Sequence, residues 1–142
     1  MKRALICSVV LVGFAAAISP AAAHTAKHGR APRSAAKARR VLRTDVKKLA
    51  GDFTHKRYGA VCSDLTPKEL RKLGGPKSCV LKVALLSSAI SVKRFTLVKV
   101  AINRSRTRAT VAIRITGSHP QVLHGVFRWA GRKYRLNQTP GF

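Results

Sequence analysis

Only four carboxylate side chains are available for chemistry in this chain of 142 residues, against 29 lysines and arginines. Hydrolysis by a pair of acids and the binding of calcium or magnesium both require several carboxylates close together. The four are Asp45, Asp52, Asp64 and Glu69. The first two fall in an expected helix beside basic positions, and the last two lie at an expected helix cap. We therefore interpret all four as surface or capping groups, and the composition argues against a carboxylate-rich site.

Among the five histidines, His124 is the one that an enzyme could use. It falls on an expected strand, and imidazole can act as a general base near neutral pH. Such a base needs an acid partner or a nucleophile beside it, and the sequence identifies neither. We therefore favour a partly exposed strand histidine and keep catalysis by His124 as the alternative.

The residues that follow a predicted signal peptide could form a copper-binding site. If cleavage follows Ala23, the chain begins with His24, whose free amine and imidazole could bind copper(II) together with His28. The surrounding stretch is expected to be flexible, which disfavours a preorganised metal site. We therefore expect no metal and no other cofactor.

The first 23 residues are typical of a secretory signal peptide. Lys2 and Arg3 form a positive start, residues 4–18 are mainly apolar, and alanines at 21–23 supply small residues for cleavage. The apolar stretch is short for a membrane span, and no later segment approaches roughly 18 apolar residues. A retained membrane anchor stays open as the alternative. We expect cleavage near Ala23 and a location outside the cytoplasm, either secreted or in the cell envelope.

Two cysteines, Cys62 and Cys79, remain after the predicted signal is removed, because Cys7 lies within it. An oxidising compartment favours a disulfide between them. Closing a loop of this length stabilises a fold by about 3 kcal/mol if the bridge is unstrained. Two unpaired thiols are the alternative, whereas a redox-active pair would need the two cysteines to be much closer in the sequence.

The formal net charge is +25, and basic residues begin soon after the predicted signal. Residues 24–34 contain no acid and no large apolar side chain, so we expect a flexible basic arm there, followed by one domain over residues 35–142. We expect the arm and the start of the domain to bind polyanions through Arg30, Arg33, Lys37, Arg39 and Arg40. The expected partners are anionic polymers or an anionic membrane surface. Sequence-specific binding of nucleic acid is not expected, because zinc-finger spacing and RNA-recognition aromatic motifs are absent from the sequence.

Apolar spacing predicts helices in the first half of the domain and strands in the second. Thr66, Pro67 and Glu69 are typical of a helix start with a capping box. After Ser91 the apolar period changes from near 3.6 residues to two. The expected elements are helices over residues 35–59, 67–73 and 77–89 and strands over residues 93–103, 109–116, 121–130 and 133–137. Short connections between the strands favour an antiparallel meander, so we predict an α+β fold with N-terminal helices packed on a curved four-stranded sheet.

Two segments of the chain form a familiar pattern. AVCSDLTP at residues 60–67 follows a long helix and precedes a second cysteine by one short helix, and GRKYRL at residues 131–136 lies in the last hairpin. Over roughly residues 35–137 the chain resembles the nuclear transport factor 2-like superfamily of SnoaL-like, cystatin-like α+β rolls, and above all its small secreted bacterial members. The resemblance implies a cone-shaped roll whose bent sheet and long helix enclose a cavity. Members use it for isomerisation, hydrolysis, ligand holding or subunit contact.

Two functional hypotheses follow. The first is a secreted, non-enzymatic domain that associates with anionic envelope polymers or lipid, or holds a small ligand in its cavity. The second is an isomerase or dehydratase that uses His124 with Tyr58, Tyr134 or Asp52 around the cavity. Enzymes of the superfamily place an acid or a His–Asp pair in the cavity, and no position here matches those residues. Self-association into a homodimer stays open.

Overall fold

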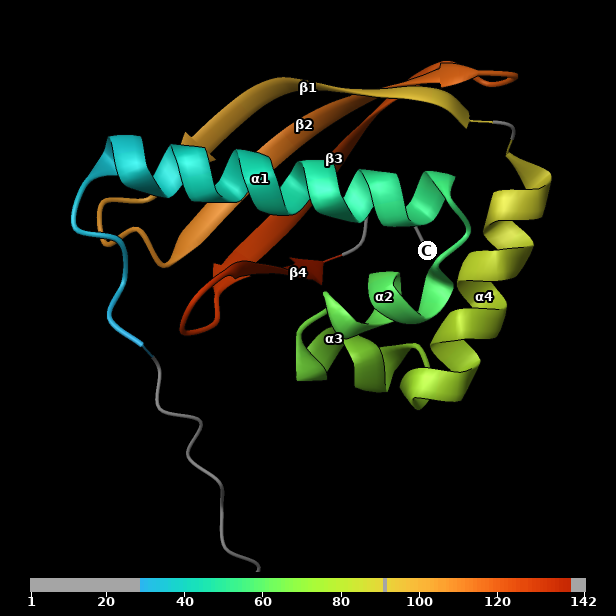
Figure 1. Ribbon diagram of the computed structural model, residues 1–142, viewed down its shortest axis with the longest axis horizontal. Coiled ribbons are helices and arrows are strands. Elements are labelled where there is room, and N and C mark those ends of the chain that lie inside the picture. The colour runs from blue at the N-terminus through green and yellow to red at the C-terminus, as the bar shows by residue number, and fades with distance from the viewer. Residues whose placement is uncertain (1–28, 91, 139–142) are drawn as a thin grey trace, which may run out of the picture.

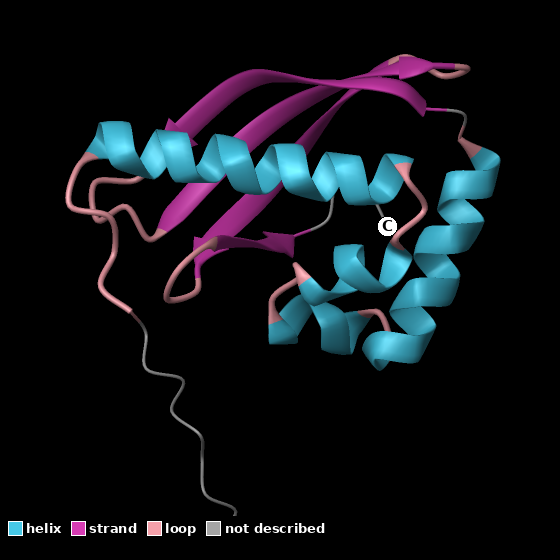
Figure 2. Ribbon diagram, in the orientation of Figure 1, coloured by secondary structure: helices cyan, strands magenta, loops and turns pink. Residues whose placement is uncertain are grey.

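The computed structural model describes residues 29–90 and 92–138 (Figure 1). The helices are α1 (Ala35–Thr54), α2 (Tyr58–Ser63), α3 (Pro67–Lys72) and α4 (Gly75–Ala89), and the strands are β1 (Val92–Ile102), β2 (Arg108–Gly117), β3 (Gln121–Trp129) and β4 (Tyr134–Gln138). The predicted α+β class is confirmed. Figure 2 shows α1 lying across one face of the sheet. Helices α2, α3 and α4 are grouped near the C-terminal end of α1.

Helix α1 begins as its sequence predicts and ends earlier than expected. The Ser34 hydroxyl accepts a hydrogen bond from the Lys37 amide at 3.1 Å, which caps the first turn. The helix was expected to continue to about Gly59, and this is wrong: it stops at Thr54. Lys56 takes a left-handed conformation with φ 58°, which turns the chain into the separate short helix α2.

The predicted cap of α3 is confirmed in its first half. The Thr66 hydroxyl accepts a hydrogen bond from the Glu69 amide at 3.4 Å, and Pro67 stands in the first turn. The Thr66 amide, which a capping box pairs with the acid, donates to the Leu136 carbonyl at 2.8 Å. Leu136 in turn donates to the Asp64 carbonyl at 2.9 Å. The start of α3 is therefore joined to β4 as well as capped.

The predicted disulfide between Cys62 and Cys79 is present in the structure, with Cα atoms 6.1 Å apart. Both cysteines are buried. The bridge was expected to connect the end of the first helix to the next long helix. Because α1 ends before Cys62, the bridge joins α2 to α4 instead.

The four strands form one antiparallel sheet in the order β1–β2–β3–β4, which is not closed. Alternation of side chains places Val111, Phe127, Tyr134 and Leu136 in the core with Leu42 of α1. These strand positions were predicted from the period of two, and the meander order was predicted from the short connections between the strands. Opposite residues such as Arg114 and Arg128 are exposed, as expected.

The last residues of the predicted basic arm contact the sheet. The indole Nε1 of Trp129 donates a hydrogen bond to the Gly29 carbonyl at 2.8 Å, and Pro32 is buried. Gly29 also lies so close to the backbone of Gly131 that a larger residue would clash. Gly29 and Pro32, in the part of the predicted arm that the structure describes, therefore contact the folded domain. The predicted signal at 1–23, His24 and His28 lie outside the described residues.

Two further observations concern the residues that the structure describes. None of their helices combines the length and the apolar character that crossing a membrane requires. They also contain no group of three or more histidine, cysteine or acidic side chains that could hold a metal ion.

Candidate functional site

All four carboxylates lie within the described residues, and two of them, Asp52 and Asp64, share one cation, Lys48. Asp52 accepts hydrogen bonds from Lys48 at 2.8 Å and pairs with Arg57 at 2.8 Å. Asp64 is bonded to the same Lys48 at 2.9 Å and to Lys133. We call these five residues the carboxylate cluster. Asp52 was expected on a solvated face, and this is wrong: it is 3% exposed and Asp64 is 7% exposed.

The other two carboxylates also bind to their surroundings. One carboxylate oxygen of Asp45 accepts a hydrogen bond from the Tyr134 amide at 2.7 Å, which ties α1 to β4. Glu69 pairs with Lys72 at 3.2 Å and is 3% exposed, although a surface or capping position was expected for it. Asp45, Asp52 and Asp64 therefore connect separate segments of the fold, whereas the ion pair of Glu69 with Lys72 lies within α3.

The pKa values of these groups follow from their neighbours. The Lys48 ammonium lowers the pKa of Asp52 below its ordinary value of 3.8. Burial alone would raise the pKa of Asp64, but hydrogen bonds from Lys133 and Lys48 hold it below that value. The hydrogen bonds of Lys48 to Asp52 and Asp64 raise the pKa of the Lys48 ammonium above its ordinary value of 10.5. Asp45 has a raised pKa, because burial is its largest influence.

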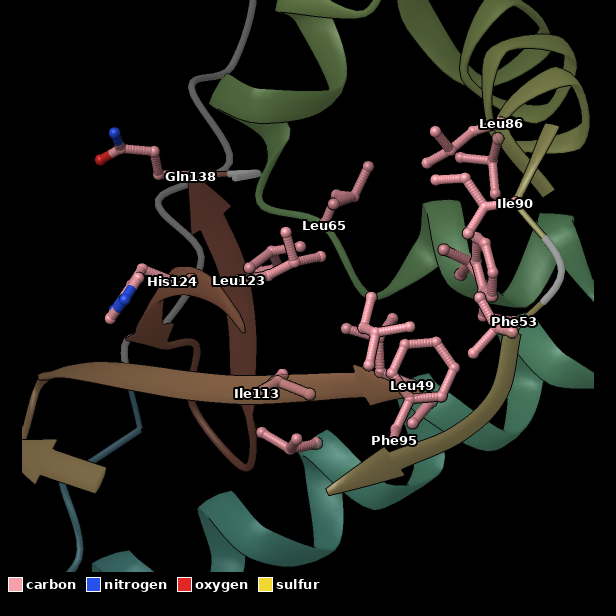
Figure 3. A pocket seen from close by; sticks show the side chains of 18 of the residues that line it. Leu49, Phe53, Leu65, Leu86, Ile90, Phe95, Ile113, Leu123, His124 and Gln138 are labelled. Atoms are coloured by element: carbon pink, nitrogen blue, oxygen red, sulfur yellow. The ribbon is translucent and has the colours of Figure 1, made fainter. Parts of the chain in front are cut away.

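A cavity of about 640 Å³ lies between the helices and the sheet. Figure 3 shows its lining of mainly apolar side chains. The lining residues come from α1, α2, α4 and all four strands, and from Leu65, Leu73 and Ile90 between elements. The labelled apolar residues are Leu49 and Phe53 of α1, Leu65, Leu86 of α4, Ile90, Phe95 of β1, Ile113 of β2 and Leu123 of β3. A volume between about 300 and 1,000 Å³ with an apolar lining is usual for small-molecule sites.

His124 lies at one end of this cavity and is exposed. Figure 3 shows its ring, like the amide of Gln138, pointing away from the apolar side chains. Within the described residues, no side chain forms a hydrogen bond with the imidazole ring of His124. The acid partner or nucleophile that general base catalysis requires is therefore not placed beside it.

The other residues of the enzyme hypothesis make contacts within the fold. The Tyr134 hydroxyl donates to the Arg106 carbonyl at 2.7 Å, and its ring packs edge-on against Trp129. Tyr58 packs against the core, and Asp52 belongs to the carboxylate cluster. The structure does not bring these groups together around His124.

A second hollow, of about 710 Å³, lies between α1 and β1. Four cations line it: Arg39, Arg43 and Lys47 from α1 and Lys99 from β1. We call this hollow the basic groove. No carboxylate lines it, and none of these four side chains forms an ion pair within the described residues.

The basic groove coincides with the predicted polyanion-binding residues at one position only, Arg39. The other four, Arg30, Arg33, Lys37 and Arg40, are exposed and do not line it. The signal that the prediction missed is the interval of four residues from Arg39 to Arg43 to Lys47, which places the three on one side of a helix. The sequence does not show that Lys99 belongs to the same groove, because this depends on the packing of α1 against β1.

Helix α4 leaves an apolar outer face. Leu81 and Leu85, one turn apart, are 66% and 69% exposed. Exposed leucines of this kind are found in protein contacts. Self-association into a homodimer therefore stays open.

No protein-family model matches this chain, and no curated protein or solved structure matches it at a significant level. The resemblance to the nuclear transport factor 2-like superfamily therefore stays a prediction from the two sequence motifs and the order of elements.

Proposed function

We propose that this protein is an exported, non-enzymatic binding domain of the nuclear transport factor 2-like kind, which associates with anionic surfaces of the cell envelope. The observation that supports this most is the engagement of all four carboxylates inside the fold. The remaining lysines and arginines have no acidic side chain left to neutralise them. Such a surface attracts anionic polymers and lipid head groups at low ionic strength.

The test is binding as a function of salt. The purified protein should bind heparin and vesicles that contain phosphatidylglycerol at low salt, and log Kd should rise linearly with log salt concentration. Vesicles of phosphatidylcholine alone are the matched control and should bind much more weakly. Equal binding to both vesicles, or binding that is insensitive to salt, would refute an electrostatic association.

The cavity supports a second function for the same domain, the holding of a small apolar ligand. Its lining is almost wholly apolar, and its volume is that of a ligand site rather than of a packing defect. The neutral dye N-phenyl-1-naphthylamine should therefore bind with enhanced fluorescence. Ala50 lines the cavity, so Ala50→Leu should weaken dye binding, whereas Ala101→Leu at an exposed strand position should not. Absence of dye binding by the native protein would refute this function.

A further inference from the structure

We propose that the cavity and the basic groove form one site for a single-chain lipid with an anionic phosphate head group. The acyl chain lies in the cavity and the phosphate lies among the cations of the groove. This inference rests on the proposed ligand-holding function and adds to it the chemical class of the ligand.

The two hollows are neighbours. Val46, Ala50, Phe95 and Ile113 line both of them. These residues come from α1, β1 and β2, so the hollows meet where α1 crosses the sheet. Ala50 has the smallest side chain of the four and is half-buried. It therefore leaves the most room for a chain to pass from the groove into the cavity.

The apolar part of the site fits an acyl chain better than a compact polar molecule. Phe53, which lines the cavity, packs edge-on against Phe95 of the shared wall with ring centroids 5.7 Å apart. Beyond them the cavity is lined by Leu86 and Ile90. A polar ligand would lose its hydration there without gaining hydrogen bonds, whereas hydrocarbon gains from leaving water.

The groove fits an anionic head group. Arg39 and Arg43 each present several N–H donors in a planar fork, which matches the oxygens of a phosphate. Lys47 and Lys99 add two further positive charges. Because no carboxylate lines the groove, these cations have no internal partner to compete with a ligand.

The experiment compares two lipids with the same acyl chain below their critical micelle concentrations. Displacement of N-phenyl-1-naphthylamine should show that lysophosphatidylglycerol, which has a net negative charge, binds about tenfold or more tightly than zwitterionic lysophosphatidylcholine. The preference should shrink as salt is raised, because the head group binds at the protein surface. This measurement needs no variant.

Two variants with equal loss of charge locate the head group. The groove variant Arg39→Gln/Arg43→Gln/Lys47→Gln/Lys99→Gln should lose the preference and keep dye binding. The control variant Arg104→Gln/Arg108→Gln/Arg128→Gln/Arg132→Gln changes four exposed cations that line neither hollow, and it should keep the preference. If the groove variant does not fold, the single change Arg43→Gln should still reduce the preference.

The outcomes separate this inference from the function on which it rests. If the native protein binds the dye but binds both lipids equally, the inference is wrong and ligand holding stands. If the control variant loses the preference as fully as the groove variant, general charge attracts the lipid and the groove does not. If the native protein binds neither dye nor lipid, ligand holding fails as well.

Discussion

Two sides of helix α1 carry basic residues that have different partners. Toward the C-terminal half, Lys48 bonds to two buried carboxylates, Asp52 and Asp64. Along the basic groove, Arg39, Arg43 and Lys47 face no carboxylate. Both sets are solvent-accessible lysines and arginines of one helix, and only the position of the acids distinguishes them.

The cations of this protein therefore serve two purposes: some stabilise the fold, and others are available to bind a partner. In the carboxylate cluster, charge is used to connect α1, the segment after α2 and the β3–β4 connection through Lys48, Asp64 and Lys133. In the groove, charge connects no elements and is left for a partner outside the fold. Removing charge should therefore destabilise the protein at the cluster and weaken binding at the groove.

Removal of the disulfide should give the largest effect. Cys62 lies two residues before Asp64, and its bridge holds α2 against α4. We expect Cys62→Ala/Cys79→Ala to lower the free energy of unfolding by about 3 kcal/mol, because the unfolded chain regains its freedom. Urea unfolding measures this, and reduction of the native protein should give a similar loss. A change of less than about 1 kcal/mol would show that the bridge is not a main support.

Removal of a shared acid should have the next largest effect. Asp64→Asn deprives Lys48 and Lys133 of a charged acceptor. We expect a loss of about 2 kcal/mol, reduced from the value of a fully buried pair because both lysines reach solvent. Urea unfolding of the native protein and the variant measures the difference. An unchanged free energy of unfolding would show that these ion pairs contribute no more than ordinary surface ion pairs.

Acid should destabilise the cluster in a predictable direction. Asp52 and Asp64 have folded-state pKa values below 3.8, so the unfolded chain binds protons more readily than the folded one. Their stabilisation is complete above that value and is lost as the pH falls through the folded pKa values. The raised pKa of Asp45 acts in the opposite direction and offsets part of the loss. Unfolding measured between pH 6 and pH 2 should show a fall that is smaller in Asp64→Asn; equal slopes would contradict this assignment.

Neutralising the groove should have the smallest effect on folding. We expect Arg43→Gln to change the free energy of unfolding by less than about 0.5 kcal/mol, since its side chain has no ion pair to lose. Elution from heparin should nevertheless occur at lower salt than for the native protein. A loss as large as that of Asp64→Asn would remove the distinction between the two sides of α1.

Local patterns account for most of the secondary structure. The alternation from Val111 to Ile115 and from Leu123 to Phe127 predicts strands because a sheet with one buried face imposes a period of two. The break after Thr54 was not predictable in the same way. The apolar spacing continues from Phe53 to Tyr58, and the turn depends on one left-handed residue, Lys56, whose conformation is unusual for its type.

The candidate sites were predictable only in part. The disulfide followed from two cysteines and an expected oxidising compartment, and the structure confirms the pairing. The burial of Asp64 was missed because its cations, Lys48 and Lys133, lie 16 and 69 residues away in the sequence. The cations of Asp52 are close to it in the sequence, and its burial depends on tertiary packing instead. Composition alone treats such acids as exposed.

The sequence by itself determined the α+β order, the capped start of α3, the cysteine pair and the excess of positive charge. Each of these depends on residue types or on spacing within a short segment. The tertiary structure decided which cations are neutralised, where the cavity lies and which residues border it. Those properties depend on side chains that meet only after the helices pack against the sheet, because electrostatic pairing and burial are set by distance in space rather than along the chain.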